Sequence, residues 1–215
     1  VEALKNGLNL EMPGCIVHNV RIVKEAVEQG TLKEEELNEA ILPMLEVAKW
    51  TEKKEEIGKE ILDSNAVLAV KFALDGAVLL RNEKDILPLK KETPLAVIGD
   101  FFTYMRYQGS GSSMLTPYAL STFESAFNKR GISYEFAQGY EDGENKVDLK
   151  KEKEALELAK KKDVIVFFGG LSDFDESEGF DKTSLHMPEN QFHLLVELQK
   201  LGKPIVFMMS TGTPV

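Results

Sequence analysis

The stretch Val164-Ile165-Val166-Phe167-Phe168-Gly169-Gly170 decides how the fold of this 215-residue chain is interpreted. Its apolar side chains follow one another without a polar interruption, and two glycines end the run. A strand with one face in water alternates apolar and polar residues, whereas a strand buried on both faces does not. The runs at residues 95–100 and 204–209 have the same character. We therefore predict three strands of a sheet that is covered on both faces.

Helical patterns separate these strands. A Lys/Glu-rich segment at about residues 149–162 leads into the first run, and Pro188 opens a helix that ends near Gly202. Strands that alternate with amphipathic helices are typical of a mostly parallel sheet. Residues 64–215 are therefore predicted to form an open α/β sandwich. The other elements predicted in it are helices at about 64–76 and from Thr116-Pro117 to Gly131, and strands at 77–80 and 133–139.

The first part of the chain has a different organisation. A helix is predicted at about residues 15–29, and Gly30 ends it. Thr31 and Glu34 have the spacing of a capping box and predict the start of a second helix. The charged residues 51–63 are predicted to be a linker, with an exposed continuation of that helix as the alternative. Apolar patterns run up to both ends of the sequence, so we expect it to be a piece of a longer protein.

The composition argues against several classes of function. A net charge of −10 (26 Lys and Arg against 36 Asp and Glu) repels a phosphate backbone, so nucleic acid is not an expected partner. No apolar run is long enough to span a bilayer, and no membrane partner is expected. Cys15 is the single cysteine, and the three histidines lack the spacing of a metal site. We expect no metal, no cofactor and a reducing, cytoplasmic location.

Two loops are expected to carry function, because binding residues in open α/β sheets gather beyond the carboxyl ends of strands. The loop after Asp100 contains Gly109-Ser110-Gly111-Ser112-Ser113. Its glycines permit a close backbone approach, and its hydroxyl and N–H groups hold oxygen atoms. No Gly-Lys-Ser/Thr follows, so it is not a P-loop, and the glycine spacing does not fit a dinucleotide fingerprint. A flexible surface loop is the alternative interpretation.

The loop after Gly170 is strongly acidic, and three interpretations compete for it. The carboxylates could bind a hard cation, although their spacing does not match an EF-hand loop. They could be solvated surface charge. One of them could have a pKa raised by like charge and partial burial, as a general acid requires. The residues alone leave the last two interpretations open. The carboxylates are Asp173, Asp175, Glu176, Glu178 and Asp181.

The whole chain resembles glycoside hydrolase family 3. The most specific match is Glu178-Gly179-Phe180-Asp181-Lys182 with Pro188 and Gln191, which is similar to the Glu-Gly-x-Asp-Arg…Pro-x-x-Gln pattern of that family. The other collinear matches are Gly7-Leu8-Asn9-Leu10-Glu11-Met12-Pro13-Gly14, residues 77–83 with Leu87-Pro88-Leu89, Val97-Ile98-Gly99 with the glycine-serine loop, and residues 210–215.

The resemblance implies a (β/α)8 barrel followed by an α/β sandwich, with the active site between them. On this basis residues 1–50 are the C-terminal part of the barrel, residues 51–63 the linker, and residues 64–215 a sandwich truncated at its C-terminus. The implied activity is that of a retaining, exo-acting β-glycoside hydrolase, with β-glucosidase as the leading expectation. Its implied partner is a small glycoside or oligosaccharide, and it needs no cofactor.

The resemblance also implies roles for individual residues. Glu178 corresponds to the acid/base glutamate, and Ser112 corresponds to a serine of the sugar subsite. Asp181 is expected in the substrate-binding loop, where it orients the loop, and Gln191 is expected to be structural. Phe180 is expected to pack the loop down and to exclude water from the catalytic carboxyl group.

Three departures from the family pattern affect these expectations. The motif of the nucleophilic aspartate is absent, so this chain alone is expected to be inactive. It would need the remainder of the barrel, in the same parent chain or in a companion chain. Without that nucleophile, the raised pKa of Glu178 is expected to relax. Asn9 replaces a usual aspartate, and Lys182 replaces an arginine and lacks its bidentate fork.

Other functions remain as alternatives. Within the family these are β-xylosidase, arabinofuranosidase and N-acetylglucosaminidase, because the pocket residues lie mostly outside this sequence. From another class, a noncatalytic α/β module could bind carbohydrate or a protein partner. A nucleotide-binding domain is disfavoured because a phosphate motif is missing. The apolar helical faces of residues 15–50 predict that the isolated chain associates or needs a partner.

Overall fold

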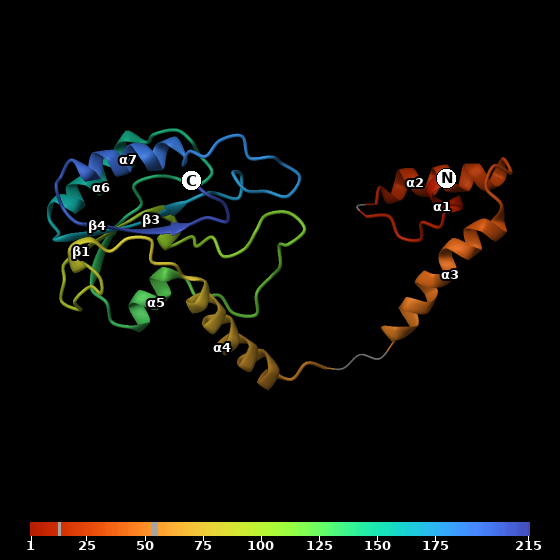
Figure 1. Cartoon of the computed structure of the whole chain (residues 1–215), viewed down its shortest axis with the longest axis horizontal. Coiled ribbons are helices and arrows are strands. Elements are labelled where there is room, and N and C mark those ends of the chain that lie inside the picture. The colour runs from red at the N-terminus through yellow and green to blue at the C-terminus, as the bar shows by residue number, and fades with distance from the viewer. Residues whose placement is uncertain (13, 53–55) are drawn as a thin grey trace. The chain divides into compact units, whose positions relative to one another are not determined.

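The computed structural model describes residues 1–12, 14–52 and 56–215 (Figure 1). The chain divides into two compact units, Val1–Asn65 and Ala66–Val215. No helix in the described residues is both long enough and apolar enough to cross a membrane. The second unit contains both loops that the sequence predicts to be functional.

The first unit is helical and has a small core. It contains α1 (Glu2–Lys5), α2 (Ile16–Glu28), α3 (Glu34–Trp50) and the start of α4 (Lys59–Gly76). Among its described residues, only Ala26, Leu32 and Ala40 are buried. Helices α2 and α3 confirm the helices predicted at residues 15–29 and after Thr31. Their apolar side chains are largely exposed. The exposed ones include Ile16, Val17, Val20, Leu42 and Leu45.

The predicted capping box of the second helix is wrong in its residues. Lys33 is the N-cap residue of α3, and its backbone N–H donates to Glu36 Oε2 at 2.8 Å. Thr31 instead donates its hydroxyl proton to the carbonyl oxygen of Ala26, at the end of the preceding helix, at 3.1 Å. A hydroxyl engaged with the end of α2 does not cap the start of α3. Part of the predicted linker, residues 53–55, lies outside the described residues.

The second unit is built on a parallel sheet, as predicted. In the described chain the strands are β1 (Leu95–Ile98), β2 (Tyr134–Ala137), β3 (Val164–Gly170) and β4 (Ile205–Ser210), in the order β2-β1-β3-β4. All three neighbouring pairs are parallel. All seven residues of β3 are buried, which confirms the interpretation of its continuous apolar run.

Helices cover both faces of the sheet (Figure 1). On one face α6 (Leu149–Lys160) and α7 (Glu189–Gln199) pack onto side chains such as Ile165 and Phe167. On the other face α5 (Phe123–Lys129) packs with Phe102 against Val166 and Phe168. Because successive side chains of a strand point to opposite faces, β3 supplies apolar groups to both cores. The short 3₁₀ helices are η1 (Glu83–Asp85) and η2 (Asp100–Phe102).

Two elements differ from the prediction. Residues 77–80 form no strand, and the apolar side chains of Val78, Leu79 and Leu80 are exposed. The described residues give this segment no partner strand, so its β propensity has nothing to pair with. The helix predicted from Thr116 begins instead at Phe123, where the Thr122 hydroxyl accepts a hydrogen bond from the Ser125 N–H at 3.0 Å. A threonine N-cap is present, six residues later than predicted.

The strand order creates a switch point between β1 and β3. The chain leaves β1 toward β2 on one side, and it leaves β3 toward β4 on the other side. Loops that diverge at such a point leave room for ligands at the carboxyl edge of the sheet. Gly99 and Gly170 stand where these loops start, with φ of 122° and 143°. A Cβ at either residue would lie 1.9 Å from a backbone oxygen of the neighbouring strand.

Candidate active site

The site is formed where the loops after β1 and β3 meet. Ser110 and Ser177 form an isolated parallel bridge between them, and the Glu178 N–H donates to the carbonyl oxygen of Ser110 at 3.4 Å. One carboxylate oxygen of Glu178 accepts a hydrogen bond from the Ser112 N–H at 2.6 Å. The structure thus brings together two of the site residues that the sequence predicts, although they are 66 positions apart.

Gly111 allows these loops to approach so closely. Its φ is 93°, and a Cβ at this position would lie 2.7 Å from Cβ and 2.9 Å from Oε2 of Glu178. A side chain here would occupy the space of the glutamate, and a φ of this sign is strained for any residue other than glycine. The backbone of the glycine-serine loop therefore makes room for the Glu178 side chain and binds its carboxylate.

The Glu178 carboxyl group is ionised more readily than an ordinary glutamate. Hydrogen bonding from the Ser112 side chain, and then from its backbone N–H, lowers the pKa of Glu178. The carboxyl group is exposed, and the described chain offers it no neighbouring negative charge strong enough to reverse this direction. The expectation that Phe180 dries the carboxyl group is wrong, because the Phe180 side chain is 79% exposed. Among the described residues the ring covers little apolar surface.

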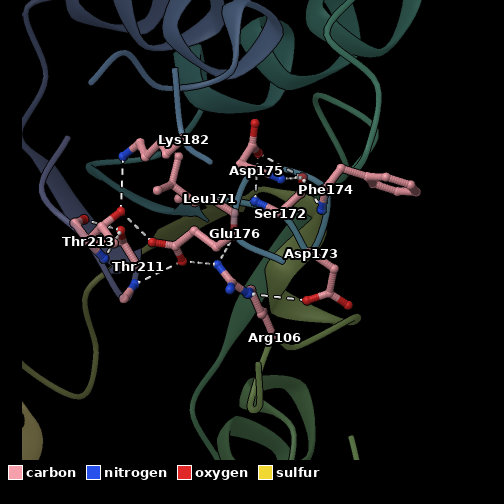
Figure 2. Close-up of polar contacts among 12 residues, drawn as sticks. Arg106, Leu171, Ser172, Asp173, Phe174, Asp175, Glu176, Lys182, Thr211 and Thr213 are labelled. Carbon is pink, nitrogen blue, oxygen red and sulfur yellow. Dashed lines mark hydrogen bonds and ion pairs between the residues drawn. The ribbon is translucent and has the colours of Figure 1, made fainter. Parts of the chain in front are cut away.

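Glu176 fastens the loop two residues before Glu178. Its Oε2 pairs with Arg106 Nη1 at 2.5 Å and accepts the Gly212 N–H at 3.0 Å, and its Oε1 accepts the Thr213 hydroxyl. Figure 2 shows Glu176 between Arg106 and Thr213, which lie in the loops after β1 and β4. One carboxylate therefore joins three loops of the carboxyl edge.

The hydrogen bonds of Glu176 outweigh the effect of its burial. Burial alone would raise the pKa of Glu176, but the bonds from Thr213, Gly212 and Arg106 hold it below the ordinary value. Glu176 is therefore a charged anchor near neutral pH. It is not suited to serve as a proton donor there.

Most other carboxylates of the acidic loop also have local partners. Asp173 Oδ1 lies 3.3 Å from Arg106 Nε. Asp175 Oδ2 accepts the Ser172 N–H at 2.8 Å and the Ser172 hydroxyl at 2.7 Å, which closes a tight turn (Figure 2). The described residues contain no group of three or more His, Cys, Asp or Glu side chains that could hold a metal ion. The cation interpretation of this loop therefore gains no support.

Asp181 and Lys182 follow Glu178 on the same loop, and the orienting role of Asp181 stays a prediction. The described residues offer Asp181 no hydrogen bond or ion pair, so the expected orienting role finds no contact. Lys182 Nζ instead donates to the Thr213 hydroxyl oxygen at 3.0 Å and to the Pro214 carbonyl at 2.7 Å. A lysine suits these single acceptors, which do not require the bidentate fork of an arginine.

Comparison with known proteins places these loops in a family. The family model described as glycosyl hydrolase family 3 C-terminal domain matches residues 77–215. The chain belongs to glycoside hydrolase family 3. The family segment covers both site loops and the residues after β4, so the Glu178–Ser112 contact and the Glu176 anchor lie within it.

Family 3 relatives extend the match over the whole chain. Thermostable beta-glucosidase B of Acetivibrio thermocellus is 38% identical over 219 residues, and an exo-alpha-(1->6)-L-arabinopyranosidase of Bifidobacterium longum is 34% identical over 222 residues. These alignments cover 100% and 98% of the chain. The crystal structure of the Bifidobacterium adolescentis GH3 beta-glucosidase matches 99% of it with a TM-score of 0.74 and 35% identity. The chain spans 29% of each curated relative and 31% of the solved protein.

Sequence reasoning missed residues that hold the acidic loop in place but are not expected to touch substrate. Arg106 and Thr213 were not singled out, although Thr213 lies in a segment that resembles the family. Gln191 has the structural contact expected of it, since its buried Oε1 accepts the Gly170 N–H at 2.8 Å. A lone arginine before a glycine-rich loop, with acidic residues after a later buried strand, is a signal that could have pointed to the Arg106–Glu176 pair.

Proposed function

We propose that this chain is part of a retaining, exo-acting β-glycoside hydrolase, and that Glu178 is its acid/base residue. The observation that carries the proposal is the exposed Glu178 carboxylate, which is seated on Ser112 at the switch point of a family 3 sandwich domain. A β-glucoside is the proposed substrate, in line with the names of the beta-glucosidase relatives.

In this reaction Glu178 acts twice. It first gives its proton to the glycosidic oxygen while the bond from that oxygen to the anomeric carbon breaks and a nucleophilic carboxylate bonds to this carbon. It then takes a proton from a water molecule, whose oxygen displaces the nucleophile and restores the original configuration. The Ser112 N–H would hold one oxygen of Glu178 and leave the other free for the proton.

The low pKa of Glu178 in this chain is compatible with its second role as a base. The first role requires a protonated carboxyl group near neutral pH. A nucleophilic aspartate about 5–5.5 Å away, as retention requires, would raise the pKa of Glu178 by like-charge repulsion. We place that aspartate upstream of this sequence, so this chain alone would be inactive.

The proposed domain organisation follows from the same assignment. Residues 1–50 would complete a (β/α)8 barrel, residues 51–63 would link the domains, and residues 64–215 would belong to the sandwich. The exposed apolar side chains of α2 and α3 support this, because the remainder of a barrel would cover them. Ser112 and Asp181 would then face the sugar.

A pentopyranoside is the second candidate substrate. The relative from Bifidobacterium longum is named an arabinopyranosidase, and an arabinopyranose, like a xylopyranose, lacks the exocyclic CH₂OH of glucose. A pocket that accepts xylopyranose and rejects glucose differs where it faces the carbon that bears this group. A pocket for arabinopyranose differs also at C4, whose hydroxyl has the opposite configuration to that of glucose. The substrate panel below separates these candidates.

The test is glycoside hydrolysis by the full-length protein and its Glu178→Ala variant. The panel comprises p-nitrophenyl β-glucoside, β-xyloside, α-L-arabinopyranoside and β-N-acetylglucosaminide. We expect turnover of natural disaccharides to fall about 10²–10⁴-fold in the variant, the range that general acid–base catalysis contributes. Azide should restore turnover of the p-nitrophenyl glycoside and give a glycosyl azide of retained configuration, because this anion attacks without a base.

The matched control is Glu144→Ala, which removes an exposed glutamate without a hydrogen-bond partner in the described chain. It should behave like the unaltered protein. Near-normal disaccharide turnover in Glu178→Ala would contradict the assignment and direct attention to Asp175. Absence of hydrolysis of every glycoside by the unaltered full-length protein would favour a noncatalytic, carbohydrate-binding or partner-binding module.

A further inference from the structure

The loop that carries Glu178 is held on both sides by one hydroxyl group. Thr213 Oγ1 donates a hydrogen bond to Glu176 Oε1 and accepts one from Lys182 Nζ at 3.0 Å. Glu176 lies two residues before Glu178, and Lys182 lies four residues after it. A hydroxyl offers one donor and two acceptor positions, so it can join an anion and a cation at the same time. Figure 2 shows both side chains converging on Thr213.

The anchor is sheltered from solvent at its centre. The Arg106 and Glu176 side chains are 12% and 10% exposed, and the Arg106 guanidinium also donates to the Leu171 carbonyl oxygen at 2.6 Å. Hydrogen bonds between largely buried charged groups fix the relative orientation of the two side chains. Removal of one partner leaves the charge of the other unpaired. The network therefore fixes the path of the loop on the side of Glu176.

Glu178 itself has few restraints. Its carboxylate is exposed, and in the described chain its hydrogen bonds come from Ser112 alone. The adjacent Gly179 adds backbone freedom with a φ of 85°. A carboxyl group on such a loop keeps its place only if the flanking residues keep theirs.

The geometry points to Thr213 as a positioning residue that holds Glu178 over the glycosidic oxygen through Glu176 and Lys182. This inference rests on the proposed function, because it concerns the same acid/base carboxyl group. Thr213 does not touch the reacting atoms, and its role is to align the proton donor.

Misalignment of a proton donor has a recognisable kinetic consequence. A leaving group that departs readily as an anion, such as 2,4-dinitrophenolate, does not need the proton, whereas an alkoxide does. Loss of alignment therefore lowers kcat/KM, which reports the first step, for glycosides of poor leaving groups and spares it for activated ones. The second step, in which Glu178 acts as a base, is common to both classes. General destabilisation of the fold would slow both classes equally.

The experiment compares Thr213→Val and Thr213→Ser in the full-length protein. Valine keeps the branched shape without the hydroxyl, and serine keeps the hydroxyl. For Thr213→Val we expect kcat/KM on a methyl or alkyl glycoside to fall about 10- to 100-fold, in keeping with the cost of displacing a catalytic group by about an ångström. The kcat/KM for the 2,4-dinitrophenyl glycoside of the same sugar should stay near the unaltered value, because kcat/KM reports the first step, which needs no proton for this leaving group. Thr213→Ser should restore kcat/KM on the alkyl glycoside.

Thr183→Val is the matched control. Thr183 lies in the same loop, is exposed and has no hydrogen-bond partner in the described chain, so its loss should leave both substrates unaffected. Equal losses on both substrates for Thr213→Val, or no loss on either, would overturn the positioning role. The parallel Glu178→Ala variant separates the two failures, since an active Glu178→Ala protein would refute the proposed function itself. An inactive Glu178→Ala with an unaltered Thr213→Val would refute only this inference.

Discussion

The Asp142 carboxyl group is unusual among the acids of the sheet edge. Its Oδ1 is buried without a hydrogen-bond partner in the described chain, while its backbone N–H donates to Asp100 Oδ2 at 2.9 Å. Burial raises the pKa of Asp142, the negative charges of Asp100, Asp173 and Asp175 add to this, and the Gly143 N–H opposes it in part. Ionisation of the Asp142 carboxyl group therefore costs more free energy in the folded protein than in the unfolded chain.

This shift has a definite sign for stability. A carboxyl group whose pKa is higher in the folded than in the unfolded protein makes stability fall as the pH rises between the two values. The cost is absent below the ordinary aspartate pKa of about 3.9 and is fully present above the raised value. We expect Asp142→Asn to raise the melting temperature of the full-length protein near pH 7, because the amide removes the charge and keeps the shape.

Melting curves at several pH values test this expectation. The advantage of Asp142→Asn should shrink as the pH falls toward the ordinary aspartate pKa. Asp163→Asn, which alters an exposed aspartate at the start of β3, should show no such advantage. A lower melting temperature for Asp142→Asn at pH 7 would mean that the carboxylate stabilises the loop through a contact that an amide cannot make.

At the scale of residues, the sequence was sufficient to predict the side chains expected to touch substrate. It was not sufficient to predict the contacts that keep their loop in place. Glu178 and Ser112 were named because they match motifs, and the structure brings them into contact. Arg106 and Glu176 are 70 positions apart, and Thr213 is 37 positions from Glu176. No local pattern encodes such contacts. They exist because parallel strands bring the ends of distant segments to one edge.

Among the elements, β3 depends on a polar side chain at its carboxyl end. Gln191, on the first turn of α7, is 1% exposed and accepts the Gly170 N–H at 2.8 Å. Loss of this acceptor would leave a buried N–H unpaired, at a cost of about 1–3 kcal/mol. We expect Gln191→Leu to lower the free energy of unfolding of the sandwich by about this amount.

Denaturant unfolding, followed by circular dichroism of the full-length protein, measures this change. Gln199→Leu is the matched control, because it places the same side chain at the exposed end of the same helix. It should change stability little. An unaltered unfolding midpoint for Gln191→Leu would show that water replaces the amide oxygen at the end of β3.

The sequence predicted strands well where an apolar run is continuous and buried. It predicted elements poorly where tertiary contacts determine whether a segment forms a strand or a helix. The strands at residues 95–98 and 164–170 are present and buried on both faces, which leaves a clear pattern. The strand at residues 205–210 is also present, although Met208 and Met209 in it are exposed. Residues 77–80 have the same apolar character but no partner strand among the described residues. Thr116-Pro117 has the local chemistry of a helix start, yet residues 116–122 stay non-helical. Only tertiary contacts distinguish these cases.

The two units of the molecule differ in how much core they have. The sandwich buries side chains on both faces of its sheet, whereas the first unit buries Ala26, Leu32 and Ala40 among its described residues. Helices with so few buried apolar contacts open readily. We expect the isolated chain to self-associate through the exposed apolar faces of α2 and α3, and amide hydrogens there to exchange faster than those of β1 and β3.

Light scattering after size-exclusion chromatography, together with hydrogen exchange, tests this expectation. A variant with Ile16→Gln, Val17→Gln and Val20→Gln removes three of the most exposed apolar groups of α2 and should associate less. A monodisperse chain that melts in one cooperative transition would contradict the expectation. It would show that the first unit has a complete core of its own.

The position of Thr213 in the chain also sets an order of events during protein synthesis. The ribosome makes Glu178 about 35 residues before it makes Thr213, which corresponds to a few seconds at roughly 5–20 residues per second. Throughout that interval the nascent chain carries the acidic loop without the hydroxyl that joins Glu176 to Lys182. A polypeptide released just after β4 would contain all four strands described here and would still lack the hydroxyl that holds this loop, which would leave the loop exposed to proteases and chaperones.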